Sequence, residues 1–397
     1  MTPAAADDAP PVTAAGREKR TGYLELFFDL VFVFAVTQLV TVLHRDHGLT
    51  GWRNAVLLAW LIWWAWSQFA WAGNAIDLDR RSTRVAMLAL TGVTLPAAAA
   101  IPEAAADGGG LRFAVPYAVV CLGGLALYWR GVRNDPAYRA ALRRYVPIAL
   151  VPPLVVLAGG FVDPGVRPWF WLTAVVIDLA SALAAGRGEF HVAPGHFAER
   201  HALIVLIALG ESIVAIGATV AGAPLTASVG GVVAVAFVIL GAQWWGYFDW
   251  VQAAAERRIA AEPDLQRRGR LARDLFTFGH FPIVLGSVLV AFGIENAVAH
   301  PTDRLPTYAL WAVGAGLALF AGGFVAGNAR AAGTVLPERV VGLAVAVVVT
   351  AVLGPRVGAI TLLGILAATF VLLAVLETRR RSRAAARSAG APGAPTG

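Results

Sequence analysis

Long apolar runs separated by short polar segments make up nearly the whole chain between residues 23 and 378. A helix needs roughly 17 to 25 mostly apolar residues to cross the hydrocarbon core of a membrane. On that criterion we predict twelve spanning helices, over 24–43, 52–72, 85–102, 113–129, 145–161, 168–186, 201–221, 226–250, 277–299, 306–327, 340–354 and 357–376. The pattern therefore predicts an all-α polytopic membrane protein with about twelve transmembrane helices.

Composition agrees with the pattern. The 397 residues are 58% apolar and 14% charged, against about 25% charged in soluble domains. The net charge of +7 does not indicate a nucleic-acid partner, because the Arg residues lie in short clusters between apolar runs. With the N-terminus inside, 26 of the 32 Lys and Arg residues fall on the inner side and 6 on the outer side. We therefore expect both termini to be cytoplasmic.

The chain divides into three parts on this basis. We predict a disordered cytoplasmic N-terminus over 1–22, a helical membrane domain over 23–378, and a disordered basic tail over 379–397. The first apolar run contains Asp29 and has no small-residue cleavage site behind it, so we interpret it as a retained span. The Arg-rich connection over 252–274 is expected to be cytoplasmic and partly helical.

Three pairs of similar stretches lie six predicted spans apart. "WWAWSQFAWAGNAIDLDRR" from residue 63 resembles "WWGYFDWVQAAAERR" from 244, and "AIPEA" from 100 resembles "GIENA" from 293. "ELFFDLVFVFAVTQLV" from 25 aligns with "ERHALIVLIALGESIV" from 199, which sets Thr37 against Glu211. These pairs predict two parallel six-helix repeats, over 23–186 and 199–378, related by an axis along the membrane normal.

Acidic residues at membrane depth are the main candidates for chemistry, because charged side chains there are costly and usually face a polar interior. Glu25 and Asp29 are four residues apart and share one face of the first helix. Glu211 is near the middle of its span, between Gly210, which permits close approach of a neighbouring helix, and the hydroxyl of Ser212.

Asp178 lies similarly deep. We predict Asp29, Glu211 and Asp178 as proton-binding or cation-binding residues, since few basic residues lie at their depth. A buried carboxyl group without a basic partner can bind and release a proton near neutral pH. Each candidate also has a structural interpretation: Asp29 as the partner of an Arg or a backbone N–H, and Glu211 as a protonated hydrogen-bonding group between helices.

Other polar residues are candidates for gates or for support of these acids. We include in this set Glu25, Gln38, Glu199, Arg200, Asp249, His280 and Glu295. We expect Glu199 and Arg200 to form a cytoplasmic ion pair or latch at the mouth of the bundle. His191, His196 and His201 lie five residues apart around a Pro-Gly turn, a spacing that does not place metal ligands on one helix face, so we predict no metal site. We expect no cofactor, because we find no phosphate-binding loop or nucleophile motif.

Four stretches resemble the bacterial low temperature requirement protein A family: "ELFFDLVFVFAVTQL", "HFAERHALIVLIALGESIVAIG", "WWGYFD" and "GHFPIVLGSVLVAFGIENA". The resemblance covers residues 20–378 and implies a multi-pass protein of the bacterial inner (plasma) membrane. The family is named for a requirement for growth in the cold, and this name implies no mechanism. The resemblance singles out Glu25, Phe28, Asp29, Glu199, Arg200, Gly210, Glu211, Trp245, Asp249, His280 and Glu295.

Three classes of function fit these observations. We favour a secondary transporter or ion pathway. In this hypothesis membrane-embedded carboxylates bind a proton or cation, and the protein transports an unidentified small solute. The first alternative is a non-transporting membrane protein that supports bilayer or lipid function in the cold. The second is an intramembrane enzyme that modifies lipid, with an acid as the general base. The bilayer is the one partner that all three require, and the oligomeric state stays open.

Overall fold

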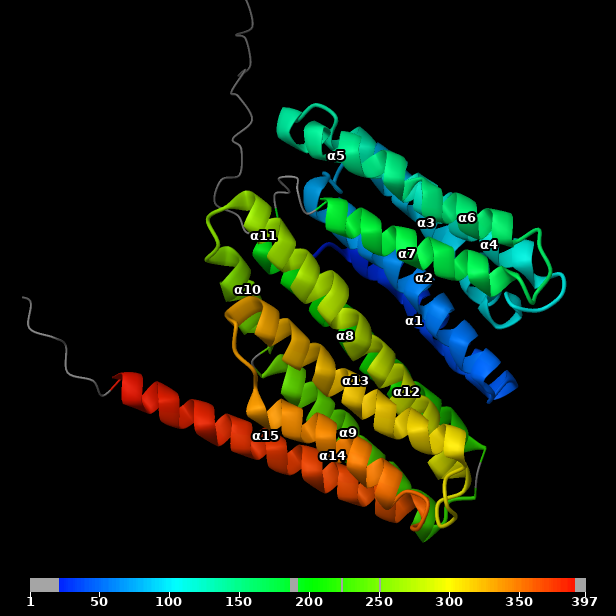
Figure 1. The fold of residues 1–397 in the computed structure, drawn as a ribbon, viewed down its shortest axis with the longest axis vertical. Coiled ribbons are helices and arrows are strands. Elements are labelled where there is room, and N and C mark those ends of the chain that lie inside the picture. Colours follow the sequence, from blue (N-terminus) through cyan, green and yellow to red (C-terminus); the bar gives the residue numbers. More distant parts are fainter. Residues whose placement is uncertain (1–20, 186–191, 223, 250, 390–397) are drawn as a thin grey trace, which may run out of the picture.

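The computed structural model describes residues 21–185, 192–222, 224–249 and 251–389, and within these ranges the chain is helical, without strands. Most of its long helices lie side by side with roughly parallel axes (Figure 1). They form two groups, one built from α1 to α7 and one from α8 to α15.

The first group contains seven α-helices and one 3-10 turn. Its elements are α1 (Tyr23–Arg45), α2 (Leu49–Ala75), α3 (Arg81–Ala99), η1 (Ile101–Glu103), α4 (Gly109–Val132), α5 (Pro136–Ala149), α6 (Val151–Gly159) and α7 (Arg167–Ala185). The predicted fifth span is divided between α5 and α6, which are separated at Leu150. Pro152 and Pro153 explain the division, because proline has no backbone N–H to continue the helical hydrogen bonds.

The second group contains eight α-helices and one π-helical segment. Its elements are α8 (Pro194–Ala221), α9 (Ala227–Phe248), α10 (Val251–Ala260), α11 (Leu265–Ala272), η2 (Arg273–Phe278), α12 (Gly279–Ala299), α13 (Thr307–Ala332), α14 (Pro337–Val352) and α15 (Ala359–Ala389). The helices α10 and α11 confirm the prediction that the Arg-rich connection is partly helical.

The helix contacts within each group close into a ring. In the first group α1 packs against α2 and α3, α4 against α3 and α6, and α7 against α6 and α2. In the second group α8 packs against α9 and α12, α13 against α12 and α14, and α15 against α14 and α9. The two groups meet where α1 and α2 contact α8 and α12.

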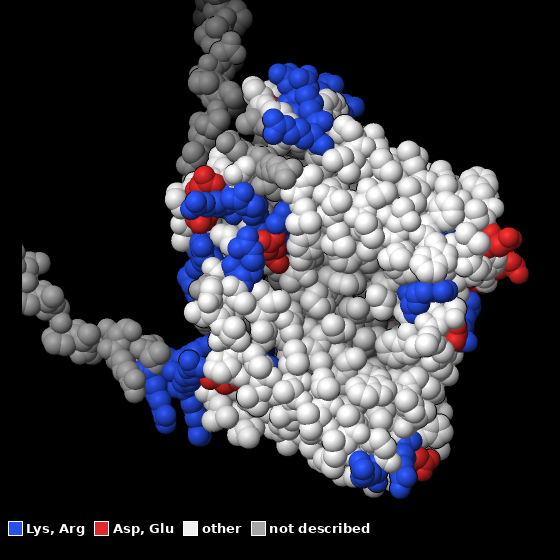
Figure 2. All heavy atoms as spheres, in the orientation of Figure 1, with Lys and Arg blue, Asp and Glu red and all other residues white. Residues whose placement is uncertain are grey.

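Charged side chains lie mainly at the two ends of the helices and leave a broad uncharged band between them (Figure 2). We call one end the basic end: α1 and α8 begin there, and it includes α10, α11 and the last turns of α15, with their Arg residues. Large apolar side chains such as Phe237, Val348 and Leu372 are exposed along the helices. A band of this kind is what a bilayer solvates, so the chain is a multi-pass membrane protein.

Ten segments of the described residues are long and apolar enough to cross a membrane. Each of the twelve predicted spans overlaps a helix, but two of those helices do not meet this criterion. The helix α14 has 16 residues, and α3 begins with Arg81 and Arg84, which shorten its apolar part. The prediction of twelve spans is therefore not confirmed.

The helix α15 extends well beyond the predicted end of the membrane domain. It continues to Ala389, so residues 379–389 are helical where the sequence analysis expects a disordered tail. The segment is rich in Ala and Arg, which are among the residues with the highest helix propensity, and it continues a helix that the membrane part has already nucleated.

Glycines bring α12 and α13 into backbone contact. A Cβ atom added at Gly286 would lie 2.5 Å from the carbonyl oxygen of Gly316, and one at Gly316 would lie 2.7 Å from the carbonyl oxygen of Gly286. Small residues at a helix crossing permit this approach, which in a membrane replaces much of the hydrophobic driving force. The crossing fixes α13 against α12 at the centre of the second group.

We expect Gly286→Ala to destabilise the protein by about 1–3 kcal/mol, the usual cost of overpacking, because the methyl group has only rigid backbone to displace. The measurement is the melting temperature of the purified protein in detergent. The matched control is Gly364→Ala in α15, where an added Cβ meets open space. Equal melting temperatures for the two variants would contradict the close crossing.

Candidate functional site

The first two turns of α1 carry two carboxylates on one face. Glu25 lies in the first turn, where its Oε2 accepts a hydrogen bond from the backbone N–H of Gly22 at 3.0 Å. A carboxylate at this position is favourable, because the first N–H groups of a helix have no intrahelical acceptor. Asp29 follows four residues later, so the two side chains lie one above the other.

The start of α8 carries the complementary pair of side chains. The helix begins at Pro194, a residue suited to the first turn because its missing N–H would have no acceptor there. His196 and Arg200 follow, four residues apart, and therefore project from one face. Both are fully buried, and this face of α8 packs against the face of α1 that carries Glu25 and Asp29.

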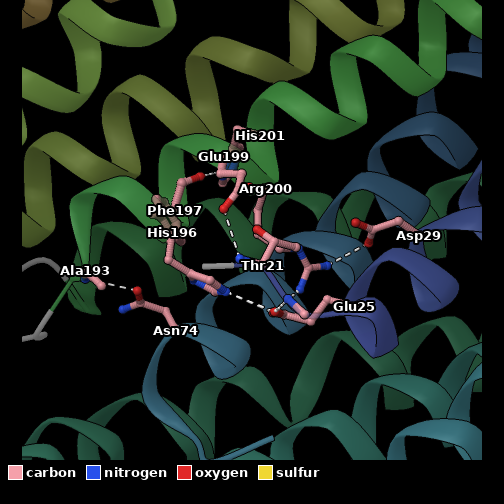
Figure 3. A network of polar contacts seen from close by, with 11 residues as sticks. Thr21, Glu25, Asp29, Asn74, Ala193, His196, Phe197, Glu199, Arg200 and His201 are labelled. Carbon is pink, nitrogen blue, oxygen red and sulfur yellow. Dashed lines mark hydrogen bonds and ion pairs between the residues drawn. The ribbon is translucent and has the colours of Figure 1, made fainter. Parts of the chain in front are cut away.

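Arg200 connects the two carboxylates (Figure 3). Its Nη1 donates to Oε1 of Glu25 and its Nη2 donates to Oδ1 of Asp29, each at 2.6 Å. Nε2 of His196 lies 3.0 Å from Oε2 of Glu25. Short ion pairs in a buried position are strong, because no water competes for the charged atoms.

Helix α2 completes the arrangement. The indole Nε1 of Trp66 donates to Oδ1 of Asp29 at 2.8 Å, and the guanidinium of Arg200 lies 5.6 Å from the centre of the Trp66 ring. Gly73 borders Glu25: a Cβ atom at this position would lie 2.5 Å from Oε1. We call Glu25, Asp29, Trp66, His196 and Arg200 the carboxylate–arginine network.

The network contains two carboxylates and one guanidinium. With His196 neutral and both carboxylates ionised, the network carries one net negative charge. Three of its buried atoms also have no hydrogen-bond partner among the described residues: Oδ2 of Asp29, Nδ1 of His196 and Nε of Arg200. One added positive charge would balance the network, and its unpartnered atoms allow further hydrogen bonds.

The sequence analysis expects few basic residues near the deep acids, and for Glu25 and Asp29 that premise is wrong. Asp29 pairs with an Arg on another helix, as its structural interpretation predicts. The expected pairing of Glu199 with Arg200 does not occur, because adjacent residues of a helix project in different directions. Glu199 instead accepts a hydrogen bond from the backbone N–H of Thr21 at 2.9 Å.

Glu211 lies farther along α8 and also contacts α1. Its Oε1 accepts a hydrogen bond from the hydroxyl of Thr37 at 2.5 Å. The hydroxyl of Ser212, which the sequence analysis expects as the partner, donates to the carbonyl oxygen of Ala208 instead. The expected close approach at Gly210 is also absent from the described structure, because a Cβ there meets open space. Glu211 thus has one neutral hydrogen-bond donor.

Asp178 lies apart from the carboxylate–arginine network and from Glu211. It is 1% exposed on α7, and neither carboxylate oxygen has a hydrogen-bond partner among the described residues. Its surroundings are aromatic: the indole of Trp60 is close enough to act on its carboxyl group as a donor, and Tyr145 and Tyr117 interact with that group electrostatically. The three predicted proton-binding or cation-binding residues therefore differ in the groups that compensate the charge of the carboxylate. Asp29 has a guanidinium, Glu211 has a hydroxyl, and Asp178 has the nearby indole of Trp60 and no cationic partner among the described residues.

The remaining predicted residues are not brought together. Gln38 lies half-buried on α1 outside the network, and Asp249 ends α9, where it interacts electrostatically with Arg381. His280 is buried; its Nδ1 donates to the carbonyl of Leu275 at 2.9 Å, and its Nε2 lies 2.8 Å from the Tyr247 hydroxyl.

Glu295 lies near the end of α12, far along the bundle from the carboxylate–arginine network. Its Oε2 is 2.9 Å from Nε2 of His44, which is in the last turn of α1. His191, one of the three histidines considered as metal ligands, lies outside the described residues, and within the described ranges no group of three metal-ligand side chains is present.

The sequence analysis does not identify Trp66 and considers His196 only as a metal ligand. A signal for His196 was present, because its spacing from Arg200 equals the spacing of Glu25 from Asp29. Two such pairs at the same predicted end of two helices are what a pair of facing helices requires. For Trp66 we find no sequence signal, since α2 contains several other tryptophans with different roles.

Comparison with known proteins identifies relatives of this chain. The family described as bacterial low temperature requirement A protein (LtrA) matches residues 20–376. An uncharacterized protein of Rhizobium meliloti (strain 1021) is 33% identical over 302 residues, which cover 73% of this chain and 72% of that protein. No solved structure matches the chain.

We expect Arg200→Met to destabilise the protein by about 3–5 kcal/mol, because it leaves two buried carboxylates without their cation. Combining it with Glu25→Gln and Asp29→Asn removes those charges and should restore much of the loss. The measurement is the melting temperature in detergent, with Arg304→Met in an exposed loop as the control. A triple variant that melts below Arg200→Met would contradict the charge compensation.

Proposed function

The chain belongs to the bacterial low temperature requirement A protein (LtrA) family, and from the geometry of its site we propose that it is a secondary transporter or ion pathway. In this proposal membrane-embedded carboxylates bind a proton or a monovalent cation. The observation that carries the proposal is the charge deficit of the carboxylate–arginine network. The network lies buried at the contact between the two helix groups.

The charge deficit provides the driving force for cation binding. Arg200 can neutralise one carboxylate, and an uncompensated charge in a buried site is costly. A proton on His196, or a cation close to Oδ2 of Asp29, would remove this cost. Cation binding is therefore favourable when the network is shielded from water. It becomes less favourable when water reaches the carboxylates and solvates them.

We further propose that the protein consists of two parallel six-helix repeats. The helix contacts support this, because the ring of α1, α3, α4, α6, α7 and α2 has the same order as the ring of α8, α12, α13, α14, α15 and α9. Thr37 and Glu211, which the sequence repeat makes equivalent, contact each other. Equivalent positions meet in this way where a two-fold axis passes between equivalent helices.

Movement of one repeat against the other is the general means of alternating access in transporters with internal repeats. Here the network bridges α1 of one proposed repeat and α8 of the other. A change in its charge therefore alters the energy that holds the two repeats together. This links cation binding to the movement that would carry a second solute.

We propose twelve spans, with the basic end on the cytoplasmic side of the plasma membrane. The Arg residues of α10, α11 and α15 support this orientation, because cytoplasmic segments are enriched in Arg and Lys. In this orientation the carboxylate–arginine network lies toward the cytoplasmic side, and Glu211 and Asp178 lie deeper.

Proton and monovalent-cation flux in proteoliposomes tests the proposal. We expect flux with the wild type and a loss of at least tenfold with Asp29→Asn or Glu211→Gln at matched incorporation. Asp29→Asn leaves one carboxylate for one guanidinium, so we expect this variant to fold and yet to lose its need for a proton. The control is Glu103→Gln, which alters an exposed ion pair with Arg112.

Two outcomes would count against the proposal. The first is no flux in the folded wild type under any imposed proton, Na⁺ or K⁺ gradient, which would favour the lipid-related classes of function. The second is full flux in Asp29→Asn, which would place cation binding outside the carboxylate–arginine network.

A further inference from the structure

A cavity lies inside the first ring of helices, toward the basic end. It is enclosed by α2, α4, α5 and α7, and α11 and η2 of the second group form part of its wall. Its empty volume is about 720 Å³, including the part open at its mouth. The network described above does not line this cavity, so the cavity is a separate place at which a ligand can bind.

Aromatic side chains make up much of the wall. Trp64 and Trp71 come from α2, Tyr128 from α4 and Tyr145 from α5. Arg273 also borders the cavity, and its guanidinium is directed at acceptors beside it. It donates to Asp274 and to the carbonyl oxygen of Ala182 at 2.9 Å. Arg330 also donates to Asp274 at 2.6 Å, so two guanidinium groups share this carboxylate and the charge of Arg273 is partly compensated.

Polar atoms without partners lie in and behind this wall. Nε1 of Trp64 and Oε1 of Gln68 have no hydrogen-bond partner among the described residues, and both residues line the cavity. Asp178 lies one helical turn before Ala182 of the wall and interacts with Tyr145 of the wall. Asp178 is buried, and it has no cationic partner among the described residues.

We infer that this cavity binds an organic cation, a protonated or quaternary amine with apolar substituents. The faces of Trp and Tyr rings attract such cations, and the attraction is stronger where water is excluded. The carboxyl group of Asp178 behind the wall supplies the opposite charge, and the apolar wall fits the substituents. Binding would compensate a buried acid that has no cationic partner in the described part of the chain.

Other ligand classes fit less well. A hard metal cation such as Ca²⁺ requires six to eight oxygen ligands. The wall offers the amide oxygen of Gln68 and scattered hydroxyl groups, and its surface is mostly aromatic and aliphatic. An anion would meet the charge of Asp178, and the guanidinium of Arg273 is directed at Asp274 and at the carbonyl oxygen of Ala182.

The wall also joins the two helix groups. Nε1 of Trp63 donates to the carbonyl oxygen of Thr277 at 2.8 Å, and Nε1 of Trp71 donates to its hydroxyl oxygen at 3.0 Å. Thr277 belongs to the π-helical segment η2, a conformation that is rare and frequent at functional sites. Movement between the groups would change this wall, so the inference names a substrate class for the proposed transporter and in that respect rests on it.

The test is equilibrium binding of phenyltrimethylammonium to the purified full chain in lipid nanodiscs, measured by tryptophan fluorescence and calorimetry. Its neutral isostere, tert-butylbenzene, has the same shape without the charge. We expect the cation to bind at least tenfold more tightly than the isostere. We expect Asp178→Asn to abolish this preference, while Asp303→Asn at an exposed loop leaves it unchanged.

Trp64→Leu provides a second variant that keeps the test decisive if Asp178→Asn does not fold. It should weaken binding of the cation about tenfold, and Trp64→Phe, which keeps an aromatic face, should retain most of the affinity. Equal binding of the cation and its isostere would overturn the inference. So would an absence of binding to the folded wild type, or unchanged affinity in both Asp178→Asn and Trp64→Leu.

Separate measurements of binding and of transport distinguish failure of the proposed cavity site from failure of the proposed transporter. Binding of the cation to nanodiscs without uptake into proteoliposomes under a proton gradient would support the cavity and contradict the transporter. Proton flux without binding of the cation would support the transporter and overturn the cavity as its substrate site.

Discussion

Two carboxylates side by side in a buried region require compensation, and that requirement determines how the two helix groups meet. A charged side chain at membrane depth costs several kcal/mol unless it is paired or solvated. Arg200 reaches both Glu25 and Asp29 only if the first turns of α8 lie against the first turns of α1. The ion pairs thus fix the register of these helices, and the contacts of α1 and α2 with α8 and α12 follow from it.

The buried acids differ in how much further positive charge each can accept. Arg200 compensates part of the charge of Glu25 and Asp29, Thr37 donates one hydrogen bond to Glu211, and neither carboxylate oxygen of Asp178 has a hydrogen-bond partner among the described residues. Only the first of these places couples the two helix groups through ion pairs. Cation binding there would change the ion pairs between the groups, whereas binding in the cavity near Asp178 would act on an aromatic wall that α11 and η2 complete.

Much of the helical framework could be predicted from the sequence, because apolar runs and Arg clusters report on single helices and on single ends. The partners of the deep acids could not be. Helical spacing shows that Glu25 and Asp29 share a face, but it does not show which helix covers that face. The same limit explains Glu211: its sequence neighbour Ser212 bonds within its own helix, and the hydroxyl that reaches it belongs to Thr37 of another helix.

The two helix groups have similar contacts but different interiors. In the second group, glycines bring α12 and α13 into backbone contact, and Arg339 joins Glu377 and the carbonyl of Gly246. Inside the first group, and walled in part by α11 and η2, a cavity lies near the buried carboxyl group of Asp178, which has no cationic partner among the described residues. A closely packed group resists deformation, because displacing rigid backbone is costly. We therefore expect movement to concentrate at the contact between the groups, where ion pairs can exchange partners with water without opening an apolar core.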